Sequence, residues 1–271
     1  MNYSVETSHG RIACRQSRGD GPAILLIHGN SSCKEVFAPQ FSAPALSEFR
    51  LVAIDLPGHG ASADAAEPAR TYTFGGYAGM AEEVVAALGL ERPVIFGWSL
   101  GGHIALEMIG RGFDARGVMI SGTPPVKADL ECLMAGFNID PAAENLTGKR
   151  EFTDDDVLAY ATHTSAADGA VDPNLLAMVK RTDGRARETM FGSVVAGQAL
   201  DEREIVATTA VPLAIVNGAG DPFIRHDYFD GLTYSSLWPE GVVKVEGAGH
   251  APFLQQPWAF NELLAKFARS S

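Results

Sequence analysis

The sequence is poor in cysteine and in positive charge. It has 3 Cys in 271 residues and no Cys-x-x-Cys pair, which predicts reduced thiols rather than a disulfide framework. Lys and Arg together number 21 against 33 Asp and Glu, which gives a formal net charge of −12 at pH 7. This net negative charge disfavours binding to the phosphate backbone of a nucleic acid, so we expect no nucleic-acid partner.

Long apolar runs are also missing. The longest one near the start is Ala23–Ile27, far shorter than the roughly 20 residues that a helix needs to cross a bilayer. Residues Met1–Gly10 lack the charged and apolar regions of a signal peptide. We therefore expect a cytoplasmic protein that has no membrane partner. No feature of the sequence indicates an oligomeric state.

Motifs for metal ions and dinucleotides are absent as well. The 7 His are scattered and form no His-Glu-x-x-His cluster, so we expect no bound metal. No Gly-x-Gly-x-x-Gly fingerprint follows the first apolar run, and we expect no cofactor.

The sequence does contain a regular succession of short apolar runs and helical stretches. Runs that are apolar throughout predict strands covered on both faces, and their alternation with helices predicts a mostly parallel sheet. At this length an α/β chain fits one core with an insertion. The predicted strands are Ala23–Ile27, Leu51–Ile54, Val94–Phe96, Val118–Ile120, Leu213–Val216 and Val242–Val245, and the predicted helices include Tyr77–Leu88, Leu100–Arg111 and Pro257–Arg269.

The βα rhythm stops after residue 122 and returns at residue 211. The intervening segment is polar, has a helical pattern and is bounded by prolines. Within it, Thr153 is a predicted helix cap followed by three aspartates, a combination that favours a helix start. We expect residues 1–122 and 211–271 to form the α/β core and residues 123–210 to form an inserted helical cap.

A Gly-x-Ser-x-Gly pattern joins the third predicted strand to the helix after it. This context predicts a nucleophile elbow, a strained strand-to-helix turn that exposes its central residue, Ser99, above the sheet. Gly97 and Gly101 allow the strand and the helix to approach each other closely. The amide of Leu100, at the helix N-terminus, is then a predicted donor to an oxyanion.

A nucleophilic serine needs a histidine base and a carboxylate that orients this base. His250 follows the last predicted strand and Asp221 follows the preceding one, and the order Ser, Asp, His is that of the α/β-hydrolase triad. Asp227 and Glu246 are alternative acids. His28, His59 and His103 do not follow a late strand, and for them we predict structural hydrogen bonds.

The loop after the first predicted strand, His28-Gly29-Asn30-Ser31-Ser32, is the predicted source of the second oxyanion donor, the Asn30 amide. The Asn30 side chain and the hydroxyls of Ser31 and Ser32 are candidates either for contacting a polar substrate group or for stabilising the turn. Asp55, at the end of the next strand, is predicted to bond local amides.

With these blocks in place, the whole chain resembles the α/β-hydrolase superfamily. Within it, the segments around residues 28–32, 96–103, 122–126, 181–187 and 249–253 look like the metal-independent N-acyl-homoserine lactonases. The resemblance implies an α/β-hydrolase fold, opening of a lactone ring without a cofactor, and a cap tyrosine, Tyr160, that contacts the substrate. Trp98 and Phe37 are candidates for an apolar acyl groove, with core packing as the alternative for each.

Two other functions use the same motifs. A broad carboxylesterase differs only in the shape of the cap, and a slow-turnover ligand receptor can be built on the same scaffold. In each case the partner is a small lactone or ester.

Overall fold

One eight-stranded sheet organises the molecule, with the strand order β1-β2-β4-β3-β5-β6-β7-β8. The computed structural model describes residues 1–140, 142–165 and 171–271. The pairs β1–β2 and β2–β4 are antiparallel, whereas the remaining pairs are parallel. The predicted α/β fold with a mostly parallel sheet is therefore confirmed.

All six predicted strands form, and two more precede them. The strands are β1 (Asn2–Thr7), β2 (Gly10–Gln16), β3 (Ala23–Ile27), β4 (Arg50–Ile54), β5 (Val94–Trp98), β6 (Gly117–Ser121), β7 (Leu213–Gly218) and β8 (Leu237–Val245). The sequence analysis missed β1 and β2 because neither has a long apolar run. In β1, the edge strand, only Val5 is buried, and in β2 the buried stretch is limited to Ile12–Cys14 between polar residues.

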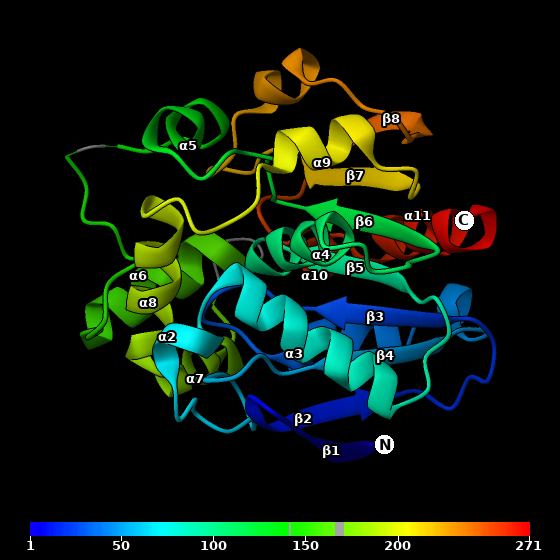
Figure 1. Ribbon diagram of the computed structural model, residues 1–271, viewed down its shortest axis with the longest axis horizontal. Helices are drawn as coiled ribbons and strands as arrows, with labels where there is room; N and C mark the ends of the chain where they lie inside the picture. Colours follow the sequence, from blue (N-terminus) through cyan, green and yellow to red (C-terminus); the bar gives the residue numbers. More distant parts are fainter. Residues whose placement is uncertain (141, 166–170) are drawn as a thin grey trace.

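Helices cover both faces of the sheet (Figure 1). They are α1 (Ala38–Phe41), α2 (Pro68–Thr71), α3 (Phe74–Ala87), α4 (Leu100–Gly110), α5 (Leu130–Gly136), α6 (Asp154–Ser165), α7 (Pro173–Arg181), α8 (Gly184–Val195), α9 (Glu202–Thr208), α10 (Pro252–Gln255) and α11 (Pro257–Ser270), with short 3-10 turns at Lys34–Phe37, Pro44–Leu46 and His226–Gly231. The predicted helices at Tyr77–Leu88, Leu100–Arg111 and Pro257–Arg269 correspond to α3, α4 and α11.

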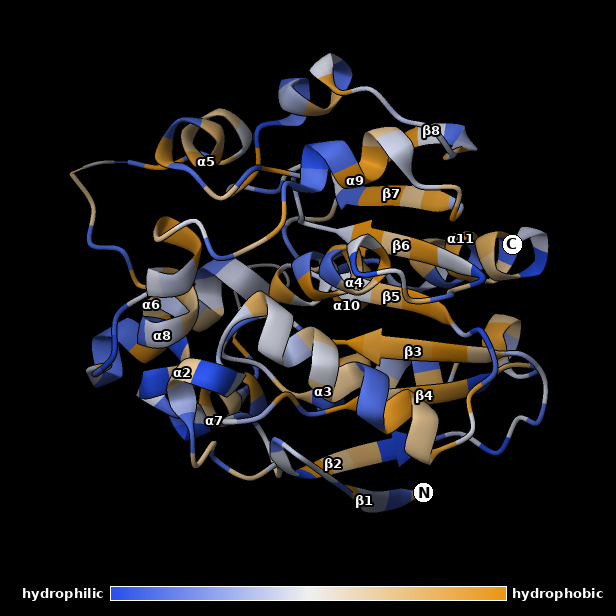
Figure 2. Cartoon of the chain, in the orientation of Figure 1, coloured by the Kyte–Doolittle hydropathy of each residue, from blue (hydrophilic) through white to orange (hydrophobic). Residues whose placement is uncertain are grey.

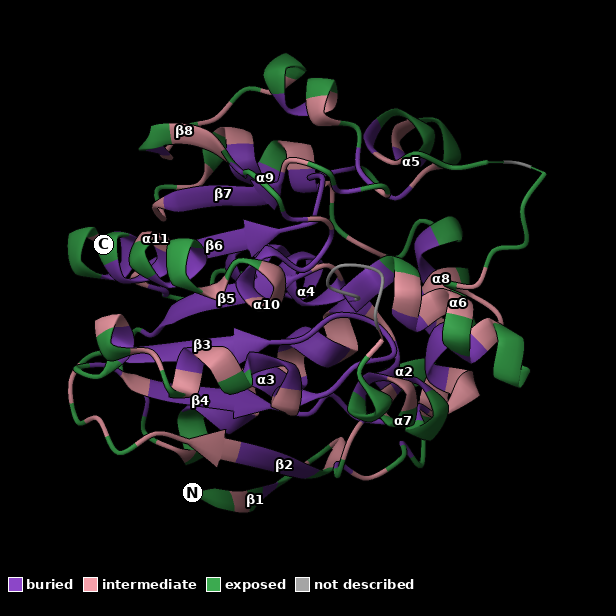
Figure 3. Cartoon of the chain, turned by 180° about the vertical axis from the view of Figure 1, so that it is seen from behind, coloured by how far each residue is buried: buried purple, intermediate pink, exposed green. Residues whose placement is uncertain are grey.

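The core has two layers, one on each face of the sheet. Along β3, Leu25 and Ile27 pack into the layer that includes α3 and α4, whereas Ile24 and Leu26 pack into the layer that includes α11. Successive side chains of a strand point to opposite faces, so an entirely apolar strand fills both layers. The central strands accordingly are the most hydrophobic part of the chain (Figure 2) and are buried (Figure 3).

Helices α5 to α9 lie between β6 and β7 in the chain. Helices α6, α7 and α8 lie beyond the carboxyl ends of the parallel strands (Figure 1). Thr153 accepts a hydrogen bond from the Asp156 amide at 3.2 Å at the start of α6, as its predicted capping role requires. Helix α9 packs against α4 of the core.

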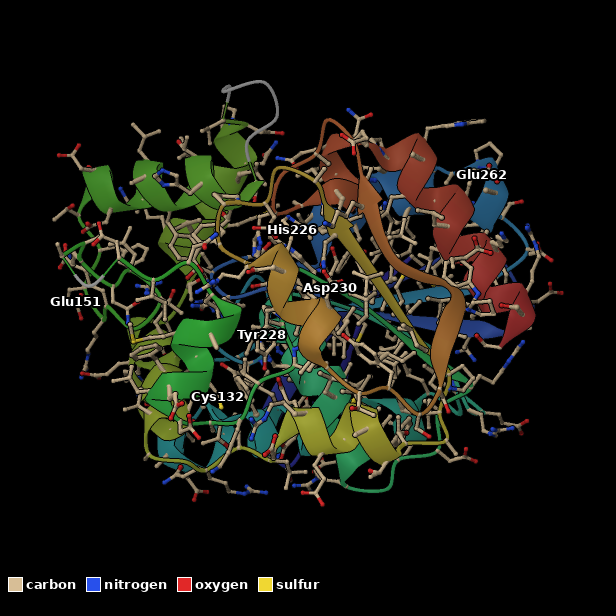
Figure 4. The ribbon with its side chains drawn as sticks, turned by 90° about the horizontal axis from the view of Figure 1, so that it is seen from above. Cys132, Glu151, His226, Tyr228, Asp230 and Glu262 are labelled. Carbon is tan, nitrogen blue, oxygen red and sulfur yellow. The ribbon has the colours of Figure 1, made fainter. Side chains whose placement is uncertain are left out.

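Helix α5 is fastened to the 3-10 turn at residues 226–231. The hydroxyl of Tyr228 on that turn donates to the Pro125 carbonyl at 2.7 Å, and Tyr228 lies close to α5, which carries Cys132 (Figure 4). In addition, Phe137 forms an antiparallel bridge with Ile224. The segment that leaves β6 is thus held against the loop that follows β7. None of the helices in the described parts of the chain is long and apolar enough to cross a membrane.

Candidate active site

The turn between β5 and α4 has the strained geometry predicted for a nucleophile elbow. Ser99 has φ 53° and ψ −119°, a conformation that is costly for a residue with a side chain. A Cβ on Gly97 would collide with the backbone of Gly101, and one on Gly101 would collide with the carbonyl of Ile27. Glycine at both positions therefore lets β5, α4 and the end of β3 meet around Ser99.

The hydroxyl of Ser99 is not used to cap α4. Its backbone amide instead donates to the Ser121 carbonyl of β6 at 2.8 Å, which fixes the turn to the neighbouring strand. The side chain stands at the positive end of the helix dipole, beside the Leu100 amide.

Asp221 and His250 form a buried pair at the ends of β7 and β8. His250 Nδ1 lies 2.8 Å from Asp221 Oδ2, and the two residues are 4% and 5% exposed. The alternative acids lie elsewhere: Asp227 pairs with Arg225 at 3.5 Å, and Glu246 is exposed. Among the three carboxylates considered from the sequence, Asp221 is the one that contacts the imidazole.

Three residues from different segments of the chain hold His250 in place. Trp98 Nε1 donates to the His250 carbonyl at 2.7 Å. A Cβ on Gly122 would lie 2.6 Å from His250 Cε1, so the turn after β6 touches the ring directly, and Phe223 packs edge-on against it with ring centroids 4.8 Å apart. Sequence analysis did not identify Gly122 or Phe223 as site residues, because their contacts with His250 join segments far apart in the chain.

The loop after β3 also lies against the elbow. A Cβ on Gly29 would sit 3.1 Å from Ser99 Cβ, so glycine brings the loop into contact with the serine. The next residue, Asn30, is buried at 6% exposure. Ser31 has φ 52°, in the left-handed region that residues with side chains rarely adopt. The structure thus brings Asn30 and Leu100 to the neighbourhood of Ser99.

His28 joins this loop to the end of β4. Its Nδ1 lies 2.7 Å from the Gly29 carbonyl, and its Nε2 accepts a hydrogen bond from the Leu56 amide at 3.0 Å. Only a neutral imidazole with its proton on Nδ1 satisfies both bonds. Burial lowers the pKa of His28 to about 4, so the ring keeps this form near neutral pH.

Three residues from the segment between β6 and β7 contact the loop at residues 30–31. The hydroxyl of Tyr160 lies 3.4 Å from the Asn30 carbonyl, and Asn30 Nδ2 donates to the Thr147 carbonyl at 3.1 Å. Arg187 donates to the Ser31 hydroxyl at 3.2 Å. Burial raises the pKa of Tyr160 to about 12, so its hydroxyl remains a donor at neutral pH. Thr147 and Arg187 were not predicted, because no local pattern marks a contact across more than a hundred residues.

The two aromatic residues predicted to line an acyl groove are both buried. Phe37 has no exposed surface, and its ring packs against Phe253 and Phe96 with centroids 5.1 and 5.8 Å away. This placement differs from the predicted groove and matches the alternative of core packing. Trp98 is 1% exposed; through its bond to the His250 carbonyl and its contact with Gly29 it supports the loops around Ser99.

The remaining polar residues singled out from the sequence make structural contacts. His59 Nδ1 lies 3.0 Å from the Pro57 carbonyl, and His103 Nδ1 lies 2.8 Å from Glu202 on α9. Asp55 accepts a bond from the Ala61 amide at 2.8 Å, which agrees with its predicted local role, but it also pairs with the backbone amide and the ammonium of Lys34, each at 2.7 Å and 21 residues away in the chain.

Elsewhere in the described ranges there is a hollow of about 610 Å³ beside α3, lined by residues that include Gly75, Gly79 and Arg111. None of the predicted site residues lines it. The same described ranges contain no group of three or more His, Cys, Asp or Glu side chains placed to hold a metal ion.

Known proteins share this architecture. The model of the alpha/beta hydrolase family matches residues 24–262. A structure of the N-acyl homoserine lactonase AidH S102G mutant complexed with N-hexanoyl homoserine lactone is 43% identical, covers 100% of this chain and 98% of that one, and has a TM-score of 0.94. A structure of AidH complexed with N-butanoyl homoserine is 44% identical over 100% of this chain and 97% of that one, also with a TM-score of 0.94.

A more distant relative acts on a different ester. The pimeloyl-[acyl-carrier protein] methyl ester esterase of Nitrosospira multiformis is 26% identical over 94% of this chain and 97% of that protein. The family model spans most of the sequence, the two AidH structures cover 100% of it and the esterase covers 94%. The chain therefore belongs to the alpha/beta hydrolase family and is an ester-hydrolysing enzyme that resembles the N-acyl homoserine lactonases.

Proposed function

We propose that this enzyme opens the lactone ring of N-acyl-homoserine lactones by acyl transfer to Ser99. The observation that carries the proposal is the 43% identity to AidH over the full chain at a TM-score of 0.94, because that similarity includes the cap as well as the core. The buried pair of Asp221 and His250 beside the elbow gives the chemistry a base and an orienting carboxylate.

In the proposed reaction Ser99 Oγ attacks the lactone carbonyl while His250 Nε2 takes its proton. The amides of Asn30 and Leu100 stabilise the oxyanion of the tetrahedral intermediate. Collapse breaks the ring C–O bond, and the imidazolium returns the proton to the leaving alkoxide. The homoserine side-chain hydroxyl thus forms, while the carbonyl of the N-acyl-homoserine is held as an ester on Ser99.

A water molecule then resolves the acyl-enzyme. His250 removes a proton from the water as it attacks the ester carbonyl, and the same oxyanion donors act again. Collapse of the intermediate breaks the bond to Ser99 Oγ, to which the imidazolium returns the proton, and the ring-opened N-acyl-homoserine leaves as a carboxylic acid that ionises in water. Asp221 orients the imidazole through Nδ1 and stabilises its charged form in both halves of the reaction. No step needs a metal ion or a cofactor.

The proposed substrate lies between the elbow and the cap. Tyr160 and Ser31 are the proposed polar contacts to the lactone or the amide, since both adjoin the Asn30 loop. Trp98 is the proposed apolar neighbour of the reacting carbonyl, because its ring packs beside His250 with centroids 5.6 Å apart. We also propose that the cap comprises α5 to α8, since α9 packs on α4.

Substitution of the proposed nucleophile and base tests this function. Ser99→Ala and His250→Ala are each expected to abolish release of N-hexanoyl-homoserine from its lactone, measured by mass spectrometry of the product, while circular dichroism remains unchanged. Ser42→Ala and His163→Ala serve as matched controls because both residues are exposed in the described fold. Substantial residual kcat in the Ser99 variant would contradict the proposal.

A broad carboxylesterase is the second candidate, favoured by the similarity to the methyl ester esterase. The two candidates differ in kcat/KM for N-acyl-homoserine lactones relative to p-nitrophenyl acetate. A higher kcat/KM for the lactones supports lactonase activity, and efficient turnover of the simple ester alone supports the esterase. Binding of lactones without turnover of either substrate would instead indicate a receptor.

A further inference from the structure

Helix α8 places a cation inside the protein next to the Asn30 loop. Arg187 is 3% exposed, and the hydrogen bonds of its guanidinium to described residues go to neutral oxygens. These are the carbonyls of Lys149 and Arg150, at 2.7 and 2.8 Å, and the hydroxyl of Ser31, at 3.2 Å. Burying a guanidinium that forms no direct ion pair with a described carboxylate is costly, although the charges of Glu151, Asp183 and Asp156 act on it from farther away. We therefore ask what its contacts to these neutral oxygens hold in place.

The contact to Ser31 reaches a strained part of the backbone. Ser31 adopts φ 52°, a conformation that costs free energy in any residue with a Cβ and persists only where neighbours enforce it. Its neighbour Asn30 is held from the cap by the Thr147 carbonyl and the Tyr160 hydroxyl. The conformation of residues 30–31 therefore depends on contacts that come from the cap.

The guanidinium itself is rigidly placed. Its carbon lies 3.8 Å from the centroid of the Phe152 ring, and its Nε and Nη2 atoms donate to the Lys149 and Arg150 carbonyls at 2.7 and 2.8 Å. Because the planar guanidinium is held at several points, it fixes the Ser31 hydroxyl relative to α8 more precisely than the flexible ammonium group of a lysine does.

We propose that Arg187 is a positioning residue that sets the oxyanion donor. By holding Ser31 in its left-handed conformation, Arg187 aims the Asn30 amide at the place where negative charge develops, so that the seating of the cap controls chemistry in the core. This inference rests on the proposed function, since it assumes that Ser99 attacks the carbonyl and that Asn30 supplies an oxyanion donor.

Hydrolysis of p-nitrophenyl acetate tests the role, because its acyl group is too small to depend on an acyl groove. Arg187→Met is expected to lower kcat about tenfold to a hundredfold, the scale of a misaligned catalytic group, with KM changed less than about threefold. Arg187→Lys keeps the charge but not the planar fork, and should retain an intermediate kcat. Lys180→Met is the control, because this exposed cap cation pairs only with Asp154 among the described side chains.

A second substitution separates positioning from simple stabilisation of the cap. Added to Arg187→Met, Ser31→Gly should recover at least about threefold in kcat, because glycine adopts positive φ without strain. Ser31→Ala, which keeps the Cβ, should recover nothing. Equal kcat values for the two double variants, or a kcat for Arg187→Met within about threefold of the unaltered enzyme, would overturn the proposal.

If circular dichroism shows that Arg187→Met does not fold, the substitutions Ser31→Gly and Ser31→Ala still test the proposal on their own. In the otherwise unaltered chain both substitutions remove the Ser31 hydroxyl, and Ser31→Ala should lower kcat for p-nitrophenyl acetate several-fold more than Ser31→Gly does, because only alanine is strained at positive φ; indistinguishable values would contradict the inference. Retained activity in Ser99→Ala would instead refute the proposed function, whatever the Arg187 and Ser31 variants do.

Discussion

His28 and His59 are two buried histidines whose protonation opposes folding. Their ring centroids lie 5.2 Å apart, and both residues are fully buried. Burial lowers the pKa of His28 to about 4 and that of His59 to about 3. In the unfolded chain a histidine binds its proton near pH 6.5, so between that pH and the lower values the unfolded state holds more protons.

Acid should therefore destabilise the protein before its carboxylates titrate. The stabilisation from each neutral histidine is complete above about pH 6.5 and is lost progressively as the pH falls toward the folded-state pKa. Between pH 7 and pH 5 we expect a loss of about 2 kcal/mol in the free energy of unfolding per histidine. Urea denaturation at the two pH values measures it.

His59→Gln isolates one of the two contributions. Between pH 7 and pH 5 the free energy of unfolding of the variant should fall by about 2 kcal/mol less than that of the unaltered protein, whatever the absolute stability of the variant. His163→Gln, at an exposed position of α6, should leave the difference unchanged. Identical pH dependence in His59→Gln and the unaltered protein would show that His59 is not held neutral by burial.

Each carboxylate oxygen of Asp221 has its own partner, one in the proposed base and one in the backbone. Oδ2 faces His250 at 2.8 Å, while Oδ1 accepts from the Phe223 amide at 2.9 Å. In Asp221→Asn the side-chain oxygen can still accept from Nδ1–H, but the neutral amide does not stabilise an imidazolium as a carboxylate does. We expect kcat for lactone hydrolysis to fall by about a thousandfold with KM within a few-fold, as steady-state kinetics would show.

A matched substitution checks that assignment. Asp227→Asn removes a carboxylate of the 3-10 turn whose side chain is 75% exposed, and kcat should not change. If Asp221→Asn also leaves kcat unchanged, the orienting role belongs to another carboxylate.

At the scale of elements, the turn between β5 and α4 could be predicted from the sequence because the residues that define it are close together in the chain. The apolar strand, the flanking glycines and the following helix lie within about twenty residues, and Ser99 takes the backbone conformation that this pattern predicts. The hairpin of β1 and β2 escaped prediction for the opposite reason. Its edge strand, β1, buries only Val5, and β2 buries only Ile12–Cys14 between polar residues, so neither strand has a long apolar run.

The close approach of β5 and α4 gives a prediction about stability. In Gly97→Ala the new Cβ would fall on the backbone of Gly101, which cannot move without displacing α4. We expect a loss of about 3 kcal/mol in the free energy of unfolding, the upper part of the usual range for overpacking, and loss of hydrolysis because Ser99 moves with the turn. Chemical denaturation and a p-nitrophenyl acetate assay measure the two effects.

The control uses a glycine without neighbours. A Cβ on Gly192 of α8 would meet nothing within 4 Å, and alanine favours the helix, so Gly192→Ala should stabilise the protein by about 0.5–1 kcal/mol. Equal effects of the two alanines would mean that Gly97 is not needed for the approach of strand and helix.

At the scale of the whole molecule, the site depends on contacts that no local pattern reveals. Asn30 meets Thr147 and Tyr160 across more than a hundred residues of chain. The sequence suggests that a cap exists, because the strand rhythm stops, but packing alone decides which cap residues reach the core. The same holds for Phe37, which lies beside the predicted loop in sequence yet packs into the core.

The seam between cap and core has its own anchor. The hydroxyl of Tyr72, a fully buried core residue, donates to Asp183 Oδ2 at 2.7 Å and accepts from the Ala65 amide at 2.8 Å. The amide of Asp183 in turn donates to the Gly58 carbonyl at 2.8 Å, and its side chain caps α8. One aspartate therefore joins the start of α8, and with it the helix that carries Arg187, to the core.

A double-mutant cycle measures how strongly this anchor couples the two parts. Tyr72→Phe should cost about 1–3 kcal/mol in the free energy of unfolding, because it leaves the buried Ala65 amide without its acceptor and removes one donor from Asp183 Oδ2, which keeps its bond to Arg185 at 2.7 Å. Combined with Asp183→Asn, the two losses should fall short of additivity by about 1 kcal/mol or more. Tyr3→Phe, which removes a bond to Gln16 at the sheet edge, should be additive with Asp183→Asn. Full additivity of Tyr72→Phe with Asp183→Asn in urea denaturation would mean that the seam is held elsewhere, in which case the register of α8 against the Asn30 loop cannot depend on this hydrogen bond.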